Sequence, residues 1–171
     1  MKRFSTHFVA CGEAAGKFLF PNNDKIEYLL NAIDVEEFSN NRIVNRSFLK
    51  DEFNLDDDTI VITQIGRISP VKNHKFTINF AEYLIQKGHK FVVAIVGSGP
   101  LKNELLALVN EKNLNNFVKF LGIRSDIPNV LAGTDVMIMP SFHEGFPVVL
   151  VESQATGVPS LISNNISSEV D

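Results

Sequence analysis

The sequence predicts an α/β protein built on a doubly wound parallel sheet, and three observations support this fold class. Strand-like and helix-like segments alternate regularly from residue 60 onward. The strand candidates are nearly continuous apolar runs, such as Phe91–Val96, which indicates burial on both faces. The helix candidates carry apolar residues at helical spacing, and one of them stops at Gly88. Parallel strands covered by helices on both faces account for all three.

The first 56 residues do not share this rhythm. We predict short strands at Phe4–Ala10 and Lys25–Leu30, and helices at Gly12–Phe20 and Arg46–Phe53. We assign no element between the polar Asn31-Ala32-Ile33-Asp34 and Arg46. Residues 1–56 are therefore interpreted as the tail of an earlier domain followed by a linker.

Residues 57–171 form the second predicted domain. Its strands are expected at Ile60–Ile65, Phe91–Val96, Val118–Leu121, Val136–Met139 and Ser160–Ile162, and its helices at Asn73–Lys87, Leu101–Lys112, Ile127–Ala132 and Pro147–Thr156. In the first helix, Phe76, Phe80, Ala81 and Leu84 follow a helical spacing. The sequence stops soon after the last strand, so we expect the domain to be truncated at its C-terminus.

Composition and charge narrow the range of function classes. The net charge is −4 with both signs interspersed, so the basic excess expected of a nucleic-acid binder is missing. The first residues lack the apolar stretch of a signal peptide, and no apolar run approaches the ~20 residues that span a bilayer. The single Cys11 cannot form an internal disulfide. These features predict a cytoplasmic protein.

The loop Gly66–Asn73, between a predicted strand and helix, combines a glycine with two cations. Gly66 allows a tight turn, and parallel sheets bind their ligands at the carboxyl ends of strands. Arg67 can donate two parallel hydrogen bonds to a phosphate, whereas Lys72 supplies a compact point charge. The alternative is that both are solvated surface cations.

A second loop leads into the helix predicted to start at Pro147, and it carries two acids with seven residues between them, Glu144 and Glu152. Proline suits the first helical position, and the amides at a helix start attract anions. Glu144 could face a ligand, and Glu152 could reach another part of it. Three alternatives stay open: Glu144 caps the helix, Glu152 lies on a solvated face, or the two acids serve hydrolysis.

Three further patterns carry less weight. Gly97-Ser98-Gly99-Pro100 resembles the start of a dinucleotide-binding fingerprint, but no third glycine follows in register. Asp56-Asp57-Asp58 invites a metal interpretation, yet it precedes a strand and reads better as a solvated turn. The four histidines show no metal-ligand spacing, and only His143 lies inside a motif. No metal site is predicted.

Taken in order, these segments resemble the bacterial retaining glycosyltransferases of the two-Rossmann (GT-B) architecture, group-4 type. The resemblance covers nearly the whole chain and rests on Gly66-Arg67 with Lys72-Asn73, Val96–Pro100, Phe120-Leu121-Gly122, Asp135-Val136 with Pro140-Ser141, Glu144 with Glu152, and Ala155–Pro159. Asn31-Ala32-Ile33-Asp34 is similar to the segment that precedes the interdomain linker in that family. The chain is thus expected to be the Rossmann-like, C-terminal, donor-binding half of such an enzyme.

The resemblance implies roles for named residues. Arg67 and Lys72, beside Gly66, would bind the diphosphate of a nucleotide sugar and stabilise its charge as it leaves. Glu144 would bind hydroxyls of the donor sugar, and Glu152 those of the ribose. The remaining donor-binding residues would act mainly through their backbone: Gly122, Ile123 and Arg124 along the base, and Gly145, Phe146, Pro147 and Val148 at the helix start.

The resemblance also implies a reaction. A hexosyl group would move with retention from a nucleotide diphosphate sugar, with uridine the expected base and no metal or other cofactor, to a saccharide or lipid-linked acceptor. The product would be a polysaccharide, such as that of a capsule. The family's first domain binds the acceptor and accounts for any contact with the inner membrane face, and nearly all of it is absent here. We therefore expect this chain alone to bind donor weakly and to transfer little or no sugar.

Three other functions stay open. A sugar-nucleotide epimerase of the same architecture is one, although the spacing of the two acids and Lys72 favour transfer. A non-catalytic nucleotide-binding remnant is the second. A nicotinamide-dependent enzyme is the third.

Overall fold

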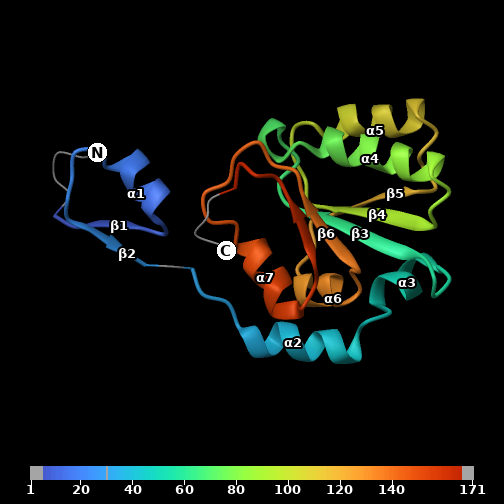
Figure 1. Cartoon of the computed structure of the whole chain (residues 1–171), viewed down its shortest axis with the longest axis horizontal. Coiled ribbons are helices and arrows are strands. Elements are labelled where there is room, and N and C mark those ends of the chain that lie inside the picture. The colour runs from blue at the N-terminus through green and yellow to red at the C-terminus, as the bar shows by residue number, and fades with distance from the viewer. Residues whose placement is uncertain (1–5, 30, 167–171) are drawn as a thin grey trace.

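The computed structural model describes residues 6–29 and 31–166 of the chain, and Figure 1 shows its path. The first described residues form a small β-α-β unit: β1 (Phe8–Ala10), α1 (Glu13–Leu19) and β2 (Ile26–Tyr28). Strands β1 and β2 pair in parallel. Three predicted positions, Phe4, Leu30 and the segment 167–171, lie outside the described residues.

The main sheet contains five parallel strands in the order β5-β4-β3-β6-β7. Their bounds are Ile60–Ile65 for β3, Phe91–Val96 for β4, Val118–Gly122 for β5, Val136–Met139 for β6 and Ser160–Ile162 for β7. These bounds agree with the predicted ones to within one residue. The predicted α/β fold with a doubly wound parallel sheet is confirmed.

Helices cover both faces of this sheet (Figure 1). One face carries α4 (His74–Gln86) and α5 (Lys102–Glu111), and the other carries α6 (Ile127–Ala132), α7 (Val148–Thr156) and α2 (Val35–Val44). A short helix, α3 (Phe48–Phe53), precedes β3, and the 3₁₀ turn η2 (Pro70–Lys72) precedes α4. Right-handed crossovers explain this division, because the chain moves from β3 towards β5 first and later from β6 towards β7.

The change of direction lies between β3 and β6. Strand β3 pairs with β4 on one side and with β6 on the other. The loops that leave β3 and β6 therefore lead to helices on opposite faces of the sheet, α4 and α7. Such a topological switch point is where open α/β sheets bind their ligands.

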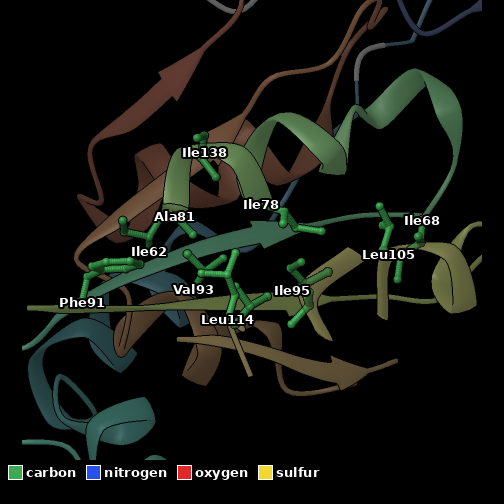
Figure 2. Close-up of a cluster of buried hydrophobic side chains, with 12 residues drawn as sticks. Ile62, Ile68, Ile78, Ala81, Phe91, Val93, Ile95, Leu105, Leu114 and Ile138 are labelled. Atoms are coloured by element: carbon green, nitrogen blue, oxygen red, sulfur yellow. The ribbon is translucent and has the colours of Figure 1, made fainter. Parts of the chain in front are cut away.

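Side chains of β3 and β4 alternate between two cores, one on each face of the sheet. Ile62, Val93 and Ile95 are buried under α4 and α5, as Figure 2 shows, whereas Val61 and Val92 are buried on the opposite face. Fully burying such a side chain contributes roughly 1.5–3 kcal/mol. Burial on both faces is the reason why these strands are continuous apolar runs.

Helix α4 buries most of the apolar residues that follow its helical spacing, but not all of them. Ile78 and Ala81 are fully buried, and Phe80 and Leu84 pack against the same core, but Phe76 is 50% exposed. Thr77 lies in the interior, where its hydroxyl donates a hydrogen bond to Gln64. Apolar spacing does not reveal such a position, because a polar side chain can also be buried when it finds a partner.

Helix α2 was not predicted, because its sequence is mostly polar. The Asp34 side chain caps the helix by accepting a hydrogen bond from the Glu37 N–H at 3.0 Å. Phe38 is buried against α6 and α7, and Arg42 donates to the carbonyls of Ala132 and Thr134 at 2.6 Å each. The spacing of Asp34 and Glu37, a capping-box pattern, was the signal that could have revealed this helix.

Helices α2 and α3 precede the predicted domain boundary at residue 57, yet they pack with the five-stranded sheet. Phe38 of α2 and Leu49 of α3 are both buried in its cores. The linker interpretation of this segment stays a prediction, and the packed unit of this structure extends back to residue 35.

Gly97 and Gly99 are explained by close contact between two loops. A Cβ atom at Gly97 would lie 2.0 Å from the Gly66 carbonyl oxygen, and one at Gly99 would lie 2.1 Å from that of Ile68. The Gly66 N–H donates to the Val96 carbonyl across the same contact at 2.9 Å. The Gly-x-Gly pattern thus lets the loop after β4 approach the loop after β3, which needs no dinucleotide.

This contact predicts that Gly99→Ala is destabilising. The Gly99 backbone does not need a positive φ, so the added methyl acts through its overlap with the Ile68 backbone, and we expect a loss of roughly 1–3 kcal/mol in unfolding free energy. Gly145→Ala is the matched control, because a Cβ there meets no atom within 4 Å. Urea unfolding measures both, and equal stability of the two variants would contradict the explanation.

Candidate functional site

The two loops that flank the switch point are joined by an ion pair. Lys72 Nζ, from the loop after β3, lies 2.6 Å from Glu144 Oε1, from the loop after β6. The side chains are only 22% and 13% exposed. The Glu144 oxygen has no aligned hydrogen-bond donor, so the contact is one of charge. Neither residue lies on a solvated face, and no side chain caps helix α7.

Buried polar side chains hold the Lys72 backbone in place. Gln64, at the end of β3, donates from Nε2 to the Lys72 carbonyl at 2.8 Å, and its Oε1 accepts from the Thr77 hydroxyl at 2.6 Å. Gln64 is 3% exposed and Thr77 is fully buried. Neither residue was predicted from the sequence to support the site. The signal was present, because a glutamine inside an apolar strand needs a buried partner.

Two more hydrogen bonds connect the loops directly. Asn73 donates from its side chain to the Pro140 carbonyl at 3.1 Å. The Phe142 N–H donates to the Val71 carbonyl at 2.8 Å. Asn73 also has a left-handed backbone, with φ of 50°, which lets the chain turn from η2 into α4. The position of Lys72 relative to Glu144 is therefore fixed by backbone contacts as well as by charge.

Arg67 lies in the same loop, with an exposed side chain that makes no hydrogen bond or ion pair to another described residue. Gly66, which precedes it, has φ of 152°, and the Lys72 side chain lies over it. The structure thus brings Gly66, Lys72 and Glu144 together. The exposed Arg67 side chain is next to this group along the chain and forms no hydrogen bond or ion pair with it.

Glu152 is placed separately, in the second turn of α7. Its carboxylate is partly buried and contacts no hydrogen-bond donor among the described residues. Burial raises the pKa of Glu152 above its ordinary value. A half-buried carboxylate without a donor can accept hydrogen bonds from a ligand.

Gly145, Phe146, Pro147 and Val148 lie before and at the start of α7, as predicted, but the helix starts one residue later than predicted. The helix begins at Val148, and Pro147 is the preceding cap residue, not the first helical residue. The N–H groups of a first helical turn have no acceptor within the helix. Gly145 and Phe146 connect this turn to Glu144. His143 is exposed and makes no contact that would assign it a role.

The predicted base loop follows β5. The Gly122 carbonyl accepts a hydrogen bond from the Gly97 N–H at 2.7 Å, and Ile123 is 82% exposed. The side chain of Arg124 points to Asp126 and Glu52, with which it forms ion pairs at 2.7 and 2.9 Å. Its guanidinium is thus engaged by protein carboxylates, whereas Ile123 and Ser125 of this loop are exposed.

Asp56 and Asp58 lie at the opposite, amino end of β3. Both contact Lys90, at 2.5 and 2.6 Å, and their side chains are 76% and 72% exposed. Within residues 6–29 and 31–166, no group of three or more His, Cys, Asp or Glu side chains is arranged to hold a metal ion. No helix of this described part combines the length and apolar character needed to cross a membrane.

The fold defines the chain as a Rossmann-like α/β domain with a topological switch point between β3 and β6. Comparison with known sequences makes this assignment more specific. The sequence pattern of the family described as glycosyl transferases group 1 matches residues 45–170. Because this match spans well over half of the chain, the chain belongs to that glycosyltransferase family.

Individual relatives agree. The chain is 37% identical, over 98% of its length, to the putative glycosyltransferase EpsF of Bacillus subtilis. It is 36% identical, over 86% of its length, to an Escherichia coli UDP-Gal:alpha-D-GlcNAc-diphosphoundecaprenol alpha-1,3-galactosyltransferase. These alignments span only 44% and 39% of the two relatives. The chain therefore corresponds to less than half of each.

A solved structure confirms the fold. The Anabaena protein Alr3699/HepE, crystallised with UDP and glucose, superposes with a TM-score of 0.80 at 24% identity, covering 98% of this chain and 47% of that protein. The predicted C-terminal GT-B domain is thus confirmed. The retaining mechanism and the group-4 type stay predictions.

The partly buried Glu152 predicts a gain in stability for Glu152→Gln. Because its folded pKa is raised, ionisation above that pKa opposes folding, and the wild-type chain regains stability as the pH falls through it. The variant should have a higher unfolding midpoint at pH 7 and a smaller gain on acidification, measured by thermal melts. Glu111→Gln, at an exposed position, is the control and should show neither effect.

His74 predicts the opposite pH response. Burial first, and the neighbouring Lys72 charge second, lower its pKa from 6.5 to about 4, and neither ring nitrogen has a hydrogen-bond partner among the described residues. The neutral ring stabilises the fold fully above pH 6.5, and this contribution, on the order of 3 kcal/mol, is lost as the pH falls towards about 4.

His74→Leu should remove this part of the acid sensitivity, because leucine has no charge to acquire. Melts between pH 7 and pH 4 should show a shallower loss of stability than in the wild-type chain. His89→Leu, at an exposed position, should keep the wild-type slope. A slope for His74→Leu equal to that of the wild type would contradict the assignment.

Proposed function

We propose that this chain is the donor-binding part of a retaining glycosyltransferase. The donor is a nucleotide diphosphate sugar, with UDP as the proposed carrier, and the transferred group is a hexosyl group. The acceptor is a saccharide or a lipid-linked saccharide in polysaccharide synthesis. The observation that carries the proposal is the Lys72–Glu144 ion pair, which joins the two loops of the switch point.

The geometry of this pair suits a sugar diphosphate. Lys72 and Glu144 lie where parallel sheets bind ligands, and they present a cation and a hydrogen-bond acceptor side by side. A diphosphate requires positive charge, and a sugar offers hydroxyl donors. When a donor binds, its phosphate and its hydroxyl groups replace each residue's present partner. Lys72 then contacts phosphate oxygens and Glu144 accepts hydrogen bonds from sugar hydroxyls, so each charged side chain keeps a favourable partner after the ion pair separates.

The exposed Arg67 complements Lys72. A guanidinium binds phosphate oxygens in a bidentate manner, and no side chain among residues 6–29 and 31–166 competes for Arg67. We assign Arg67 and Lys72 to the diphosphate and to its growing negative charge when the sugar leaves. Preorganised positive charge of this kind is a large contribution to catalysis.

The other predicted residues complete the proposed donor site. The unsatisfied amides at the start of α7, with Gly145 and Phe146 before them, lie next to Glu144 along the chain. Glu152 accepts hydrogen bonds from the ribose, for which its partly buried carboxylate has unused acceptors. The base lies along Gly122 and Ile123. No metal ion is required in this proposal, because the two cations balance the diphosphate.

Names of relatives are consistent with this chemistry. The E. coli relative is named for a UDP-galactose donor and a diphosphoundecaprenol acceptor, and the Anabaena structure holds UDP and glucose. Both proteins are more than twice as long as the part that this chain matches. We therefore propose that transfer to an acceptor depends on the remainder, and that the 171 residues alone bind donor with little or no transfer.

A binding titration with nucleotide sugars tests the donor site. We expect UDP-sugar to bind the wild-type chain, and Arg67→Ala combined with Lys72→Ala to weaken binding by at least roughly tenfold, because two cation contacts to phosphate are lost. Isothermal titration calorimetry with UDP-glucose, UDP-galactose and ADP-glucose provides the measurement.

Lys75→Ala is the control for loss of a nearby cation, since Lys75 is an exposed lysine on the first turn of α4 and its removal changes the net charge by one unit, half the change of the double variant. Its affinity should equal that of the wild-type chain. Equal binding by the wild-type chain and the double variant would exclude the assigned site. Binding of NAD with no response to UDP would replace the proposal with a nicotinamide-dependent function.

A further inference from the structure

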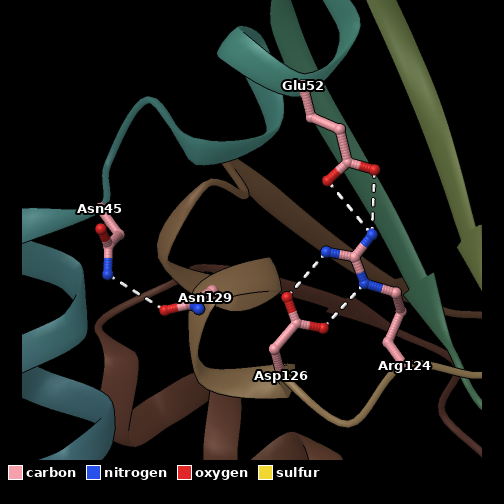
Figure 3. A network of polar contacts seen from close by, with 5 residues as sticks. All are labelled: Asn45, Glu52, Arg124, Asp126 and Asn129. Carbon is pink, nitrogen blue, oxygen red and sulfur yellow. Dashed lines mark hydrogen bonds and ion pairs between the residues drawn. The ribbon is translucent and has the colours of Figure 1, made fainter.

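Arg124 is the centre of a polar brace that joins three segments of the chain. Figure 3 shows its guanidinium between two carboxylates, Asp126 at the start of α6 and Glu52 on α3. Nε and Nη2 donate to the two oxygens of Asp126 at 2.8 and 2.7 Å. Nη1 donates to both oxygens of Glu52 at 2.9 and 3.2 Å. The Arg124 donors on both sides of the guanidinium are thus in use.

The surroundings of Arg124 restrict it further. The side chain is 20% exposed, and its guanidinium carbon lies 5.7 Å from the centre of the Phe48 ring, also on α3. Charge-assisted bidentate hydrogen bonds of this kind have a defined geometry, unlike the contact of a point charge. The loop between β5 and α6 is therefore fastened at Arg124 to a helix more than 70 residues earlier in the chain.

The same loop is fastened on its other side by backbone. The Gly97 N–H donates to the Gly122 carbonyl at 2.7 Å, and Gly122 has φ of 71°, which turns the chain out of β5. Between these two anchors lies Ile123, a large apolar side chain that is 82% exposed. An exposed isoleucine held from both sides is a rigid apolar surface at the carboxyl edge of the sheet.

We propose that Arg124, together with Glu52, is a positioning residue that holds Gly122 and Ile123 in place as the platform for the base of the nucleotide. This inference rests on the proposed function. Arg124 does not touch the nucleotide in this arrangement, because its donors are used by Asp126 and Glu52. Arg124 contributes to nucleotide affinity only through the position of the loop backbone. Its loss should therefore weaken the contacts to the base and leave the contacts to the diphosphate unchanged.

Two ligands separate these effects: UDP, and ribose 5-diphosphate, which is UDP without its base. Arg124→Gln should weaken UDP binding about fivefold to tenfold, because an unfastened loop must be ordered on binding. Ribose 5-diphosphate should bind the variant and the wild-type chain within about twofold. Glu52→Gln should weaken UDP binding selectively in the same way. Combining it with Arg124→Gln should weaken UDP binding little further, because each substitution removes the same Arg124–Glu52 interaction.

A second measurement needs no ligand. Amide hydrogen exchange at residues 122–124 should be faster in Arg124→Gln and in Glu52→Gln than in the wild-type chain, while exchange in β3 and β4 stays the same. Arg124→Lys keeps the charge and the fold but not the bidentate geometry, and it should be intermediate in both measurements. Arg46→Gln, at an exposed arginine, is the control and should match the wild-type chain.

The outcomes are distinguishable. Equal weakening of UDP and ribose 5-diphosphate by Arg124→Gln would show a general structural role and overturn the inference. Unchanged exchange at residues 122–124, or unchanged UDP affinity, would also overturn it. A wild-type chain that binds no UDP would refute the proposed function, and the base platform with it. Selective loss of UDP affinity with faster loop exchange supports the inference.

Discussion

The central position of β3 is the constraint on which the rest of the structure depends. Strand β3 pairs in parallel with β4 on one side and with β6 on the other. The connections that leave β3 and β6 therefore run in opposite directions along the sheet and cover opposite faces of it. The loops after β3 and β6 therefore meet at the carboxyl edge of the sheet, where hydrogen bonds and one ion pair join them. Lys72 and Glu144 meet there because the topology brings their loops together, although 71 positions separate them in sequence.

Backbone contacts make this meeting point rigid. Glycines at 97 and 99 allow the loop after β4 to lie against the loop after β3, and buried Gln64 holds the Lys72 carbonyl. The charged side chains near this point are less fully paired than the backbone. Lys72 and Glu144 form an ion pair, whereas Arg67 is exposed and the Glu152 carboxylate accepts no hydrogen bond from the residues that the structure describes. A fixed frame that carries unsatisfied charge is the usual compromise of a binding site, which gives up some stability for function.

Local patterns predicted the sheet well and some helices less well. The strands of the main sheet were found because two-sided burial leaves apolar runs, as in Phe91–Val96. Helix α2 was missed because its stability comes from the Asp34 cap, Phe38 and the Arg42 contacts to α6, and not from an apolar stripe. Phe76 follows the apolar spacing of α4 but is half exposed, whereas Thr77 occupies the interior through its bond to Gln64. In both helices the polar groups that decide the packing have partners distant in sequence.

The sequence alone determined the α/β class, the parallel sheet, the loops that carry cations and acids, and the family resemblance. These properties follow from local spacing and composition. Only the tertiary structure decided that Lys72 contacts Glu144, that Glu152 lacks a donor, and that Arg124 faces Glu52 instead of the loop surface. The physical reason is that such pairings depend on distance, burial and side-chain direction across the sheet, which residue types along the chain do not encode locally.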